Sequence, residues 1–296
     1  MTQQRLRGVI VKGVGGLYYA RDEAGEVHVL RARGVFRKRH ITPLVGDRIE
    51  LIPGTGDEHG WVEDILPRES VFVRPPVANV RHLVLVFAPQ PTPDMLVMDM
   101  LLVTACAQHI APILVVNKCE LDSSLGAKIR EEYAALGAPV YEVSAKTGQG
   151  LDALAEALRD GICCLAGQSG VGKSTLLSTI TGIELETGEI SRRIARGKNT
   201  TRHAELMEKN GFQVLDTPGF SLLELWNGLE PLQLKAYYPE FAPYEESCRF
   251  QPCYHLSEPG CAVLEAAREG ALSQARVDRY HELLQRVQKA WRERYE

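Results

Sequence analysis

Residues 167–174 read Gly-Gln-Ser-Gly-Val-Gly-Lys-Ser, which is the pattern Gly-x4-Gly-Lys-Ser. The pattern follows an apolar segment (Ile162–Leu165) and precedes a predicted helix (Thr175–Ile180), the context of a phosphate-binding loop. In such a loop, backbone N–H groups surround the β-phosphate and the start of the helix adds a favourable dipole. We predict that Lys173 neutralises phosphate oxygens and that the Ser174 hydroxyl ligates Mg²⁺. The predicted contact set is Gly167, Gln168, Ser169, Gly170, Val171, Gly172, Lys173, Ser174 and Thr175.

A second motif indicates which base is bound. Asn117-Lys118-Cys119-Glu120 follows the apolar segment Ile113–Val116 and resembles Asn-Lys-x-Asp, whose carboxylate accepts hydrogen bonds from guanine N1–H and N2–H₂. Glu120 keeps the charge but places it one methylene further out. Ser144-Ala145-Lys146 supports guanine, because the Ala145 amide can donate to O6. We therefore predict a GTP/GDP site whose base is bound by Asn117, Lys118, Glu120, Ser144, Ala145 and Lys146.

Switch elements follow the phosphate loop. Asp216-Thr217-Pro218-Gly219 ends a predicted strand (Phe212–Leu215), so Asp216 would hold the Mg²⁺ shell and the Gly219 amide would meet the γ-phosphate. One of Thr200 and Thr201 would close over the metal, with Thr201 assigned as the Mg²⁺ ligand, and its release would act as a switch. Phe220 stands where Ras-like enzymes have a water-orienting glutamine. The isolated protein should therefore hydrolyse GTP slowly.

A Cys/His cluster near the carboxyl end has the composition of a structural metal site. Three cysteines and a histidine occur in the pattern Cys-x4-Cys-x-His-x5-Cys. Three thiolates and an imidazole form a standard tetrahedral set for structural Zn²⁺. The pattern lacks a Cys-x-x-Cys pair, and unrelated thiols with a surface histidine are the alternative. We predict one structural zinc ion held by Cys248, Cys253, His255 and Cys261.

The bulk composition narrows the class of protein. The chain has 296 residues and a formal net charge of −4, so any nucleic-acid-binding surface has to be local. Residues 1–20 lack the apolar run of a signal peptide, and no stretch has the roughly 18 apolar residues of a membrane span. We expect a cytoplasmic monomer that does not bind membranes, whose thiols stay reduced. Four further cysteines should pack against apolar elements: Cys106, Cys119, Cys163 and Cys164.

Residues 1–72 are predicted to form a small β-barrel. Their β-branched or alternating segments are separated by turn residues, and five short strands without a long helix fit an OB-fold, with an SH3-like barrel as the alternative. The clearest strand segments are Leu6–Tyr19, Val27–Val35 and Arg48–Ile52. Five cations form either a solvated surface or a patch for RNA phosphates: Arg31, Arg33, Arg37, Lys38 and Arg39.

Two further domains follow the barrel. Residues 73–225 alternate apolar strands with helices, which predicts a parallel sheet covered on both faces. Residues 226–296 contain the Cys/His cluster and then a segment, Ala262–Glu296, that should form two helices divided near Gly270. The predicted fold is an α/β P-loop GTPase core between an N-terminal β-barrel and a C-terminal helical zinc-binding domain.

The order of the motifs is rotated, because the base-reading motifs precede the phosphate loop and the switch motifs follow it (G4-G5-G1-G2-G3). In this order, with a barrel ahead and the Cys/His cluster behind, the chain resembles the circularly permuted GTPases of the RsgA (YjeQ) family. The resemblance implies an OB-fold domain, a permuted GTPase core and a zinc-binding domain. It also implies docking on the 30S subunit late in its maturation, contact with 16S rRNA, and GTP hydrolysis that the subunit stimulates and that triggers release.

Two departures from the family pattern leave alternatives open. The family usually has Gly-Arg-His-Thr-Thr in its first switch, and the histidine proposed to assist hydrolysis corresponds to Asn199. Asparagine can orient water but cannot shuttle a proton near neutral pH. With Phe220, this motivates a first alternative, a nucleotide-gated RNA-binding module with negligible hydrolysis. The second departure, Glu120, motivates an ATP-dependent phosphotransferase.

Overall fold

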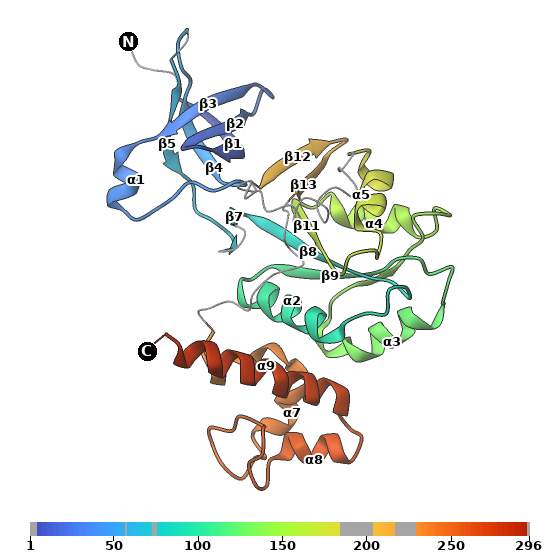
Figure 1. Cartoon of the computed structure of the whole chain (residues 1–296). Coiled ribbons are helices and arrows are strands. Elements are labelled where there is room, and N and C mark those ends of the chain that lie inside the picture. The colour runs from blue at the N-terminus through green and yellow to red at the C-terminus, as the bar shows by residue number, and fades with distance from the viewer. Residues whose placement is uncertain (1–4, 57, 73–75, 184–203, 217–228, 295–296) are drawn as a thin grey trace, which may run out of the picture.

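The computed structural model describes residues 5–56, 58–72, 76–183, 204–216 and 229–294. A β-barrel, an α/β core and a helical module follow one another along the molecule, from the N-terminus at one end to the helical module at the other (Figure 1). No helix in these ranges has the length and apolarity to cross a membrane.

The N-terminal part is a closed five-stranded barrel. Its strands lie in the order β1-β2-β3-β5-β4, and β4 pairs back with β1. The β3–β5 pair is parallel and the others are antiparallel. This topology is OB-like and decides between the two barrels that the sequence allowed. The elements are β1 (Leu6–Val14), β2 (Leu17–Asp22), β3 (Val27–Ala32), α1 (Gly34–Lys38), β4 (Arg48–Ile52) and β5 (Gly60–Ile65).

The structure confirms one predicted strand segment and corrects another. The segment Leu6–Tyr19 is divided into β1 and β2 at Gly15 and Gly16, which both adopt positive φ and form the turn expected of these glycines. The segment Val27–Val35 leaves the sheet at Ala32, because residues 34–38 form the short helix α1 and bury Phe36 in the barrel.

The core is built on a parallel sheet. β8, β9, β10, β11 and β13 are parallel neighbours in the order β10-β9-β8-β11-β13. Alternate side chains of β8 enter two different apolar clusters, Leu83, Leu85 and Phe87 on one face and Val84 and Val86 on the other. Both faces are therefore covered, as the apolar strands predicted. The elements are β8 (Val80–Phe87), α2 (Met95–Ala107), β9 (Ala111–Val116), α3 (Ser124–Glu132), η1 (Ala134–Leu136), β10 (Val140–Glu142), α4 (Leu151–Leu158), β11 (Ile162–Ala166), α5 (Lys173–Thr181) and β13 (Phe212–Asp216).

One strand of the core is not parallel, which corrects the predicted all-parallel sheet. β12 (Glu205–Lys209) runs antiparallel to β13 and pairs with β1 of the barrel at Lys12↔Glu205. The barrel and the core thus share one 11-stranded sheet. Ion pairs reinforce this junction, with Lys12 Nζ 2.8 Å from Glu205 Oε2 and Arg21 Nη1 2.8 Å from Glu208 Oε2. β6 (Val71–Phe72) and β7 (Val77–Ala78) form a separate short antiparallel pair.

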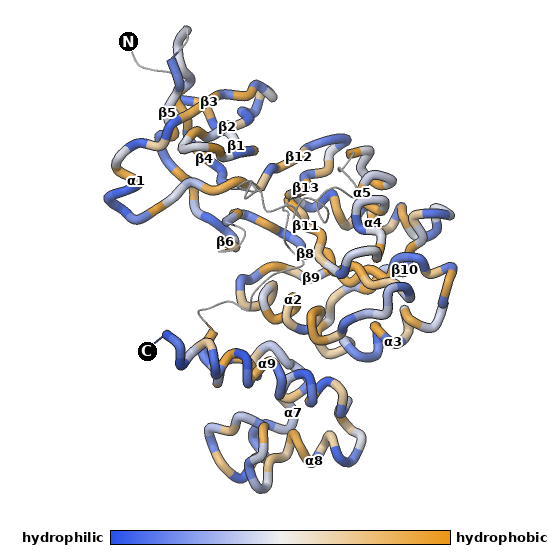
Figure 2. The backbone as a smooth tube through the Cα atoms, viewed as in Figure 1, coloured by the Kyte–Doolittle hydropathy of each residue, from blue (hydrophilic) through white to orange (hydrophobic). Residues whose placement is uncertain are grey.

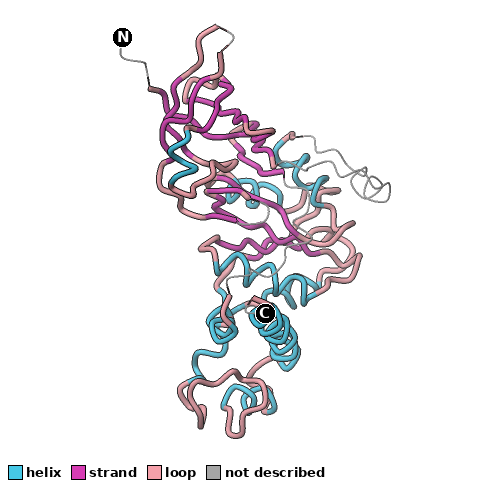
Figure 3. Tube along the Cα trace, turned by 60° about the vertical axis from the view of Figure 1, so that its left-hand side comes forward, coloured by secondary structure: helices cyan, strands magenta, loops and turns pink. Residues whose placement is uncertain are grey.

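The C-terminal module is helical (Figure 3). Its buried apolar residues form one cluster with Val103 of α2. Its elements are η3 (Pro231–Tyr237), η4 (Pro239–Phe241), α7 (Ala242–Glu245), α8 (Ala262–Arg268) and α9 (Gln274–Arg292). Tyr238, Phe241 and Tyr280 are fully buried and pack ring against ring, with centroids 4.9–5.3 Å apart. The Ser273 hydroxyl caps α9 by accepting from the Arg276 N–H. The two helices predicted around Gly270 are α8 and α9. Along α9, hydrophilic and hydrophobic residues recur in turn (Figure 2).

The four cysteines outside the Cys/His cluster pack as expected. Cys119, Cys163 and Cys164 are buried, and Cys106 is half-buried. Burial raises the pKa of the Cys163 thiol to about 12, so this side chain is a neutral packing residue at physiological pH.

Candidate nucleotide site and metal centre

The two loops that carry the base-reading motif and the phosphate loop lie at the carboxyl edge of the parallel strands. β8, β9 and β11 end at Phe87, Val116 and Ala166, and their pairing holds these ends side by side. The loop after β9 carries the base-reading motif and the loop after β11 carries the phosphate loop. Ligands of open α/β sheets bind at this edge. The base-reading motif and the phosphate loop are rotated along the chain, but in space they lie side by side.

The phosphate loop has the backbone that its glycines predict. Gly167, Gly170 and Gly172 adopt φ of +140°, +85° and +93°, and α5 begins directly after Gly172 at Lys173. The Lys173 ammonium lies within the loop and donates to the Gly167 and Gln168 carbonyls at 2.7 and 2.9 Å. Burial lowers the pKa of Lys173. Ser174 and Thr175 form the first turn of α5, where backbone N–H groups are free for an anion.

Asn117 joins the base-reading motif to the phosphate loop. Its buried side chain donates from Nδ2 to the Val171 carbonyl at 2.9 Å and accepts at Oδ1 from the Ala145 N–H at 3.2 Å. Lys118 makes a second link, donating from Nζ to the Gly170 carbonyl at 2.7 Å and to the Gln90 carbonyl at 2.9 Å. The Ala145 amide, which we expected to donate to guanine O6, therefore already has Asn117 as an acceptor.

Glu120 is held as a charged acceptor beside the second base-reading loop. A hydrogen bond with Ser144 is the main cause of its lowered pKa, and the charges of Lys146 and Lys118 act in the same direction. The Ser144 hydroxyl also accepts from the Thr147 N–H at 3.1 Å, which shapes this loop. A carboxylate that stays ionised at neutral pH is what the guanine N1–H and N2–H₂ donors require.

The structure describes only one of the predicted switch residues. Asp216 is the last residue of β13, one step beyond the Leu215↔Cys164 pair with β11, so its backbone lies next to the phosphate loop. Asn199, Thr200, Thr201 and Gly219, like Phe220, fall outside the described residues.

The phosphate loop also contacts α2, which sequence reasoning missed. The Gln168 side chain accepts from the Asp94 N–H at 2.9 Å, and Asp94 caps α2 by accepting from the Val97 N–H. Gln168 occupies a variable position of the loop pattern, so the pattern gave no signal for this contact. Through it, the phosphate loop holds the start of a helix that reaches the C-terminal module.

Helix α2 carries a buried charged residue, Asp99. The Asp99 side chain of α2 is fully buried, and Arg276 and Arg279 of α9 reach it. Tyr133 OH donates to Asp99 Oδ1 at 2.6 Å, and Arg279 Nε donates to Asp99 Oδ2 at 2.6 Å. Arg276 Nη1 also lies 2.6 Å from Asp99 Oδ1, but it does not have hydrogen-bond geometry and interacts through its charge. The signal was present in the sequence, because Asp99 is the only charged residue of an otherwise apolar helix.

The four predicted zinc ligands come together in the C-terminal module. Their ligand atoms all lie within 4.8 Å of one another, and all four residues are buried. The Cys248 and Cys261 sulfurs are 3.9 Å apart, and His255 Nδ1 lies 3.3 Å from the Cys261 sulfur. Zn–S bonds of roughly 2.3 Å in a tetrahedron give S–S edges of about 3.8 Å. The residues therefore fit a tetrahedral Zn²⁺ bound through His255 Nδ1.

Residues around the cluster orient the histidine. His255 Nε2 is buried with no hydrogen-bond partner among the described residues, and the Glu245 carboxylate lies 3.6 Å away. A carboxylate behind a metal-bound histidine fixes its tautomer. His281 and Tyr280 of α9 bond to the backbone of the same loop, at the His255 carbonyl (2.6 Å) and the Tyr254 carbonyl (2.8 Å).

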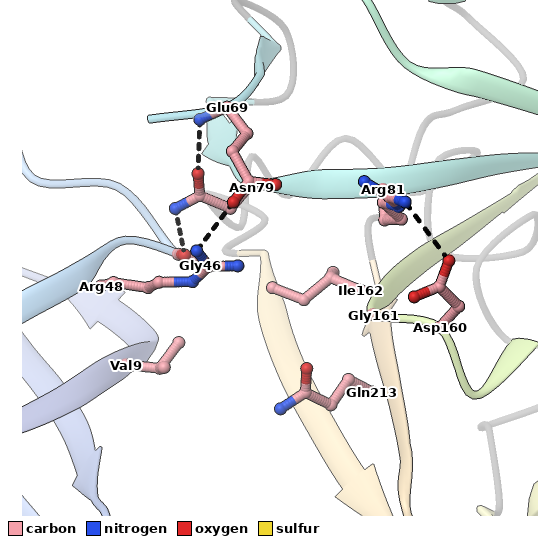
Figure 4. Close-up of a pocket in the computed structure, with 10 residues that line it drawn as sticks. All are labelled: Val9, Gly46, Arg48, Glu69, Asn79, Arg81, Asp160, Gly161, Ile162 and Gln213. Carbon is pink, nitrogen blue, oxygen red and sulfur yellow. Dashed lines mark hydrogen bonds and ion pairs between the residues drawn. The ribbon is translucent and has the colours of Figure 1, made fainter. Parts of the chain in front are cut away.

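A polar cavity of about 360 Å³ lies at the opposite, amino end of β11, between barrel and core (Figure 4). Arg48 and Arg81 face it, and each is paired with a carboxylate, Glu69 at 2.8 Å and Asp160 at 3.4 Å. The Asn79 side chain, which also lines the cavity, donates a hydrogen bond to the Gly46 carbonyl of the barrel. The sequence-predicted nucleotide residues do not line this cavity, so it is separate from the site at the carboxyl edge.

The fold and site define a class: a P-loop GTPase whose base-reading strands precede its phosphate loop, with a barrel before the core and a Cys₃His module after it. A model of the RsgA GTPase family matches residues 65–226, and a model of the RsgA N-terminal domain matches residues 7–62. The chain belongs to the RsgA family and is a GTP-hydrolysing enzyme. Membership confirms the predicted GTPase over the ATP-dependent phosphotransferase.

Individual relatives cover nearly the whole chain. A protein of Ruminiclostridium cellulolyticum named small ribosomal subunit biogenesis GTPase RsgA is 45% identical over 281 residues, or 93% of this chain and 92% of that protein. The same-named protein of Geobacillus kaustophilus is 44% identical over 282 residues, 92% of this chain and 94% of that protein.

Two solved structures are also similar. YjeQ from Thermotoga maritima has a TM-score of 0.79 at 34% identity, covering 96% of this chain and 99% of that one. YloQ, described as a circularly permuted GTPase, has a TM-score of 0.75 at 35% identity, covering 97% of this chain and 96% of that one. The predicted fold class is confirmed.

Proposed function

We propose that this GTPase acts in the late maturation of the 30S ribosomal subunit, that the subunit stimulates its hydrolysis of GTP, and that hydrolysis triggers its release. The observation that carries the proposal is the likeness, over more than nine-tenths of the chain, to proteins named for small ribosomal subunit biogenesis. The contact between the base-reading motif and the phosphate loop at one sheet edge supports the same activity.

In this proposal each loop of the site has a separate task. Lys173 and the amides of the phosphate loop bind the β- and γ-phosphates, while Ser174 and Thr201 ligate Mg²⁺ with Asp216 in its shell. Glu120, with Ser144 and Lys146 beside it, selects guanine. The Gly219 amide meets the γ-phosphate, and one of Thr200 and Thr201 closes over the metal.

We assign the slow step to water activation. Neither Phe220 nor Asn199 can act as a proton shuttle, so a group on the subunit, or another group of this chain such as His203, has to complete the site. Added subunits should then increase the rate of the chemical step, not only the affinity for GTP.

The cluster of Cys248, Cys253, His255 and Cys261 is proposed to hold one structural Zn²⁺ that shapes the C-terminal module for contact with 16S rRNA. The chemistry of the donor set and the Glu245 carboxylate behind His255 support this. On the barrel, Arg37, Lys38 and Arg39 are exposed and would contact rRNA phosphates.

We further propose that loss of the γ-phosphate at Gly219 moves residues 220–247 and tilts the zinc module on its RNA site. Hydrogen exchange across this segment should differ between states loaded with GDP and with a non-hydrolysable GTP analogue. Identical protection in the two states would remove this part of the proposal.

Single-turnover GTP hydrolysis, measured with and without purified 30S subunits at several salt concentrations, tests the function. The proposal predicts a large increase in rate with subunits and a decline of that increase with salt, because docking is electrostatic. The alternative, a nucleotide-gated RNA-binding module, predicts binding without any increase in rate. Lys173→Ala is the matched inactive control.

A further inference from the structure

An exposed tryptophan lies on the outer face of the barrel. Leu30 and Val62 point into the barrel and are fully buried, so their neighbours Arg31 and Trp61 point outward. β3 and β5 pair with Arg31 opposite Trp61. These two side chains therefore project from the same face side by side, and Trp61 is 41% exposed.

Apolar side chains extend this face across the neighbouring strand. Leu17 of β2 pairs with Arg31 on its other side, and Val29 and Val27 follow at alternate positions of β3. Val27 is 48% exposed, and Leu17 and Val29 are half-buried. We call these five residues the Trp61 face: Leu17, Val27, Val29, Arg31 and Trp61.

Three further cations follow Arg31 closely in the sequence, Arg37 and Lys38 in α1 and Arg39 at its end. Within the described residues, Arg31, Arg37, Lys38 and Arg39 have no ion pair, whereas Arg33 is 2.7 Å from Glu63. Arg37 lies six positions after Arg31, which limits the distance between their Cα atoms to roughly 20 Å. Several other arginines of the barrel are paired, among them Arg5, Arg21 and Arg48, whereas Arg7 is exposed and has no ion pair within the described residues. What distinguishes Arg31 is that an unpaired guanidinium stands next to an exposed indole.

This combination fits single-stranded nucleic acid better than a protein partner. An indole offers a flat surface on which any base can stack, and a neighbouring arginine adds a cation–π or phosphate contact. The cations without ion pairs can bind the phosphates of a polyanion, whereas a purely apolar partner would make no contact with their charges. We propose that the Trp61 face stacks an unpaired base of RNA, with Arg31 on the adjacent phosphate and the cations of 37–39 tracking the backbone. The inference rests on the proposed RNA contact of the barrel and names its chemistry.

Titration of the full-length protein with a 12-nucleotide oligoadenylate, followed by tryptophan fluorescence, tests the inference. RNA should quench the emission of wild type and of Trp291→Phe, and the quench should disappear in Trp61→Phe. Trp61→Ala should weaken binding roughly 5- to 100-fold with an unchanged salt slope, and Trp61→Phe should restore part of the affinity. Arg31→Ala should instead reduce the slope of log K against log salt by about 0.7.

Unchanged oligoadenylate affinity in Trp61→Ala would overturn the inference, and so would equally tight binding of duplex RNA. Trp61→Ala that binds RNA normally but docks poorly on 30S subunits would point to a ribosomal protein and also overturn it. GDP affinity serves as the folding control. The proposed function fails separately, if subunits do not stimulate hydrolysis by wild type.

Discussion

Replacing Asp99 with alanine should weaken the attachment of the C-terminal module to the GTPase core. Asp99 is fully buried and receives Tyr133 OH, Arg279 Nε and the charge of Arg276, while Arg276 itself is 4% exposed. The substitution leaves buried guanidinium groups with one carboxylate fewer. Removing one partner of a buried pair typically costs about 3–5 kcal/mol.

The contacts that the two arginines keep in the variant decide where in that range the loss of unfolding free energy falls. Arg276 keeps Glu240 at 2.7 Å, and Arg279 keeps Glu132. We therefore expect a loss near the lower end, about 3 kcal/mol. Burial, and then the charge of Asp99, raise the pKa of Tyr133, so its hydroxyl stays protonated and also loses its acceptor.

Urea denaturation measures the effect, with tryptophan fluorescence and zinc release as separate probes because several domains need not unfold together. The matched control is Glu282→Ala. It removes an exposed ion pair between Glu282 and Arg286 within α9 and should lower the free energy of unfolding by under about 1 kcal/mol. A loss for Asp99→Ala no larger than that of Glu282→Ala would refute the reasoning.

Gly172→Ala should abolish GDP binding, because a Cβ at φ +93° would lie 2.6 Å from Asn117 Nδ2; retained affinity in equilibrium dialysis would contradict this packing. Glu120→Gln should weaken GDP binding roughly 10- to 100-fold, since charge-assisted bonds contribute about 1.5–3 kcal/mol, and Glu120→Asp should not. The Ser144 hydrogen bond lowers the pKa of Glu120, so wild-type GDP affinity should hold as pH falls to the ordinary glutamate value and decline only below it; a decline nearer neutrality would contradict this. Chelation of zinc should increase proteolysis of residues 248–261 and leave GDP binding intact.

Local sequence pattern was enough to predict those elements whose ends carry capping residues or glycines. Asp94 and Ser273, which cap α2 and α9, are residue types favoured at helix starts, and Gly270 falls between α8 and α9 as expected. The four predicted zinc ligands lie together, as expected from their spacing. In the same way, the glycines of the phosphate loop have the positive φ that the pattern requires.

Contacts between distant segments were not readable from local pattern. Lys12↔Glu205 pairing joins barrel and core into one sheet, but neither residue differs from an ordinary exposed charge in the sequence. The link from Gln168 to Asp94 uses a variable loop position. Asp99 was different, because a lone carboxylate in an apolar helix has to find a buried partner. Only the fold shows that the partners are two arginines of α9.

Calorimetric titration of Mg²⁺-GDP and Mg²⁺-ADP into zinc-loaded protein tests the central claim most directly. If the rotated motifs build one guanine-nucleotide site, GDP should bind with one-site stoichiometry, ADP should give no saturable heat, and Lys173→Ala should lose the GDP signal while remaining folded. Equal binding of ADP, or no heat from GDP in folded wild-type protein, would contradict the account.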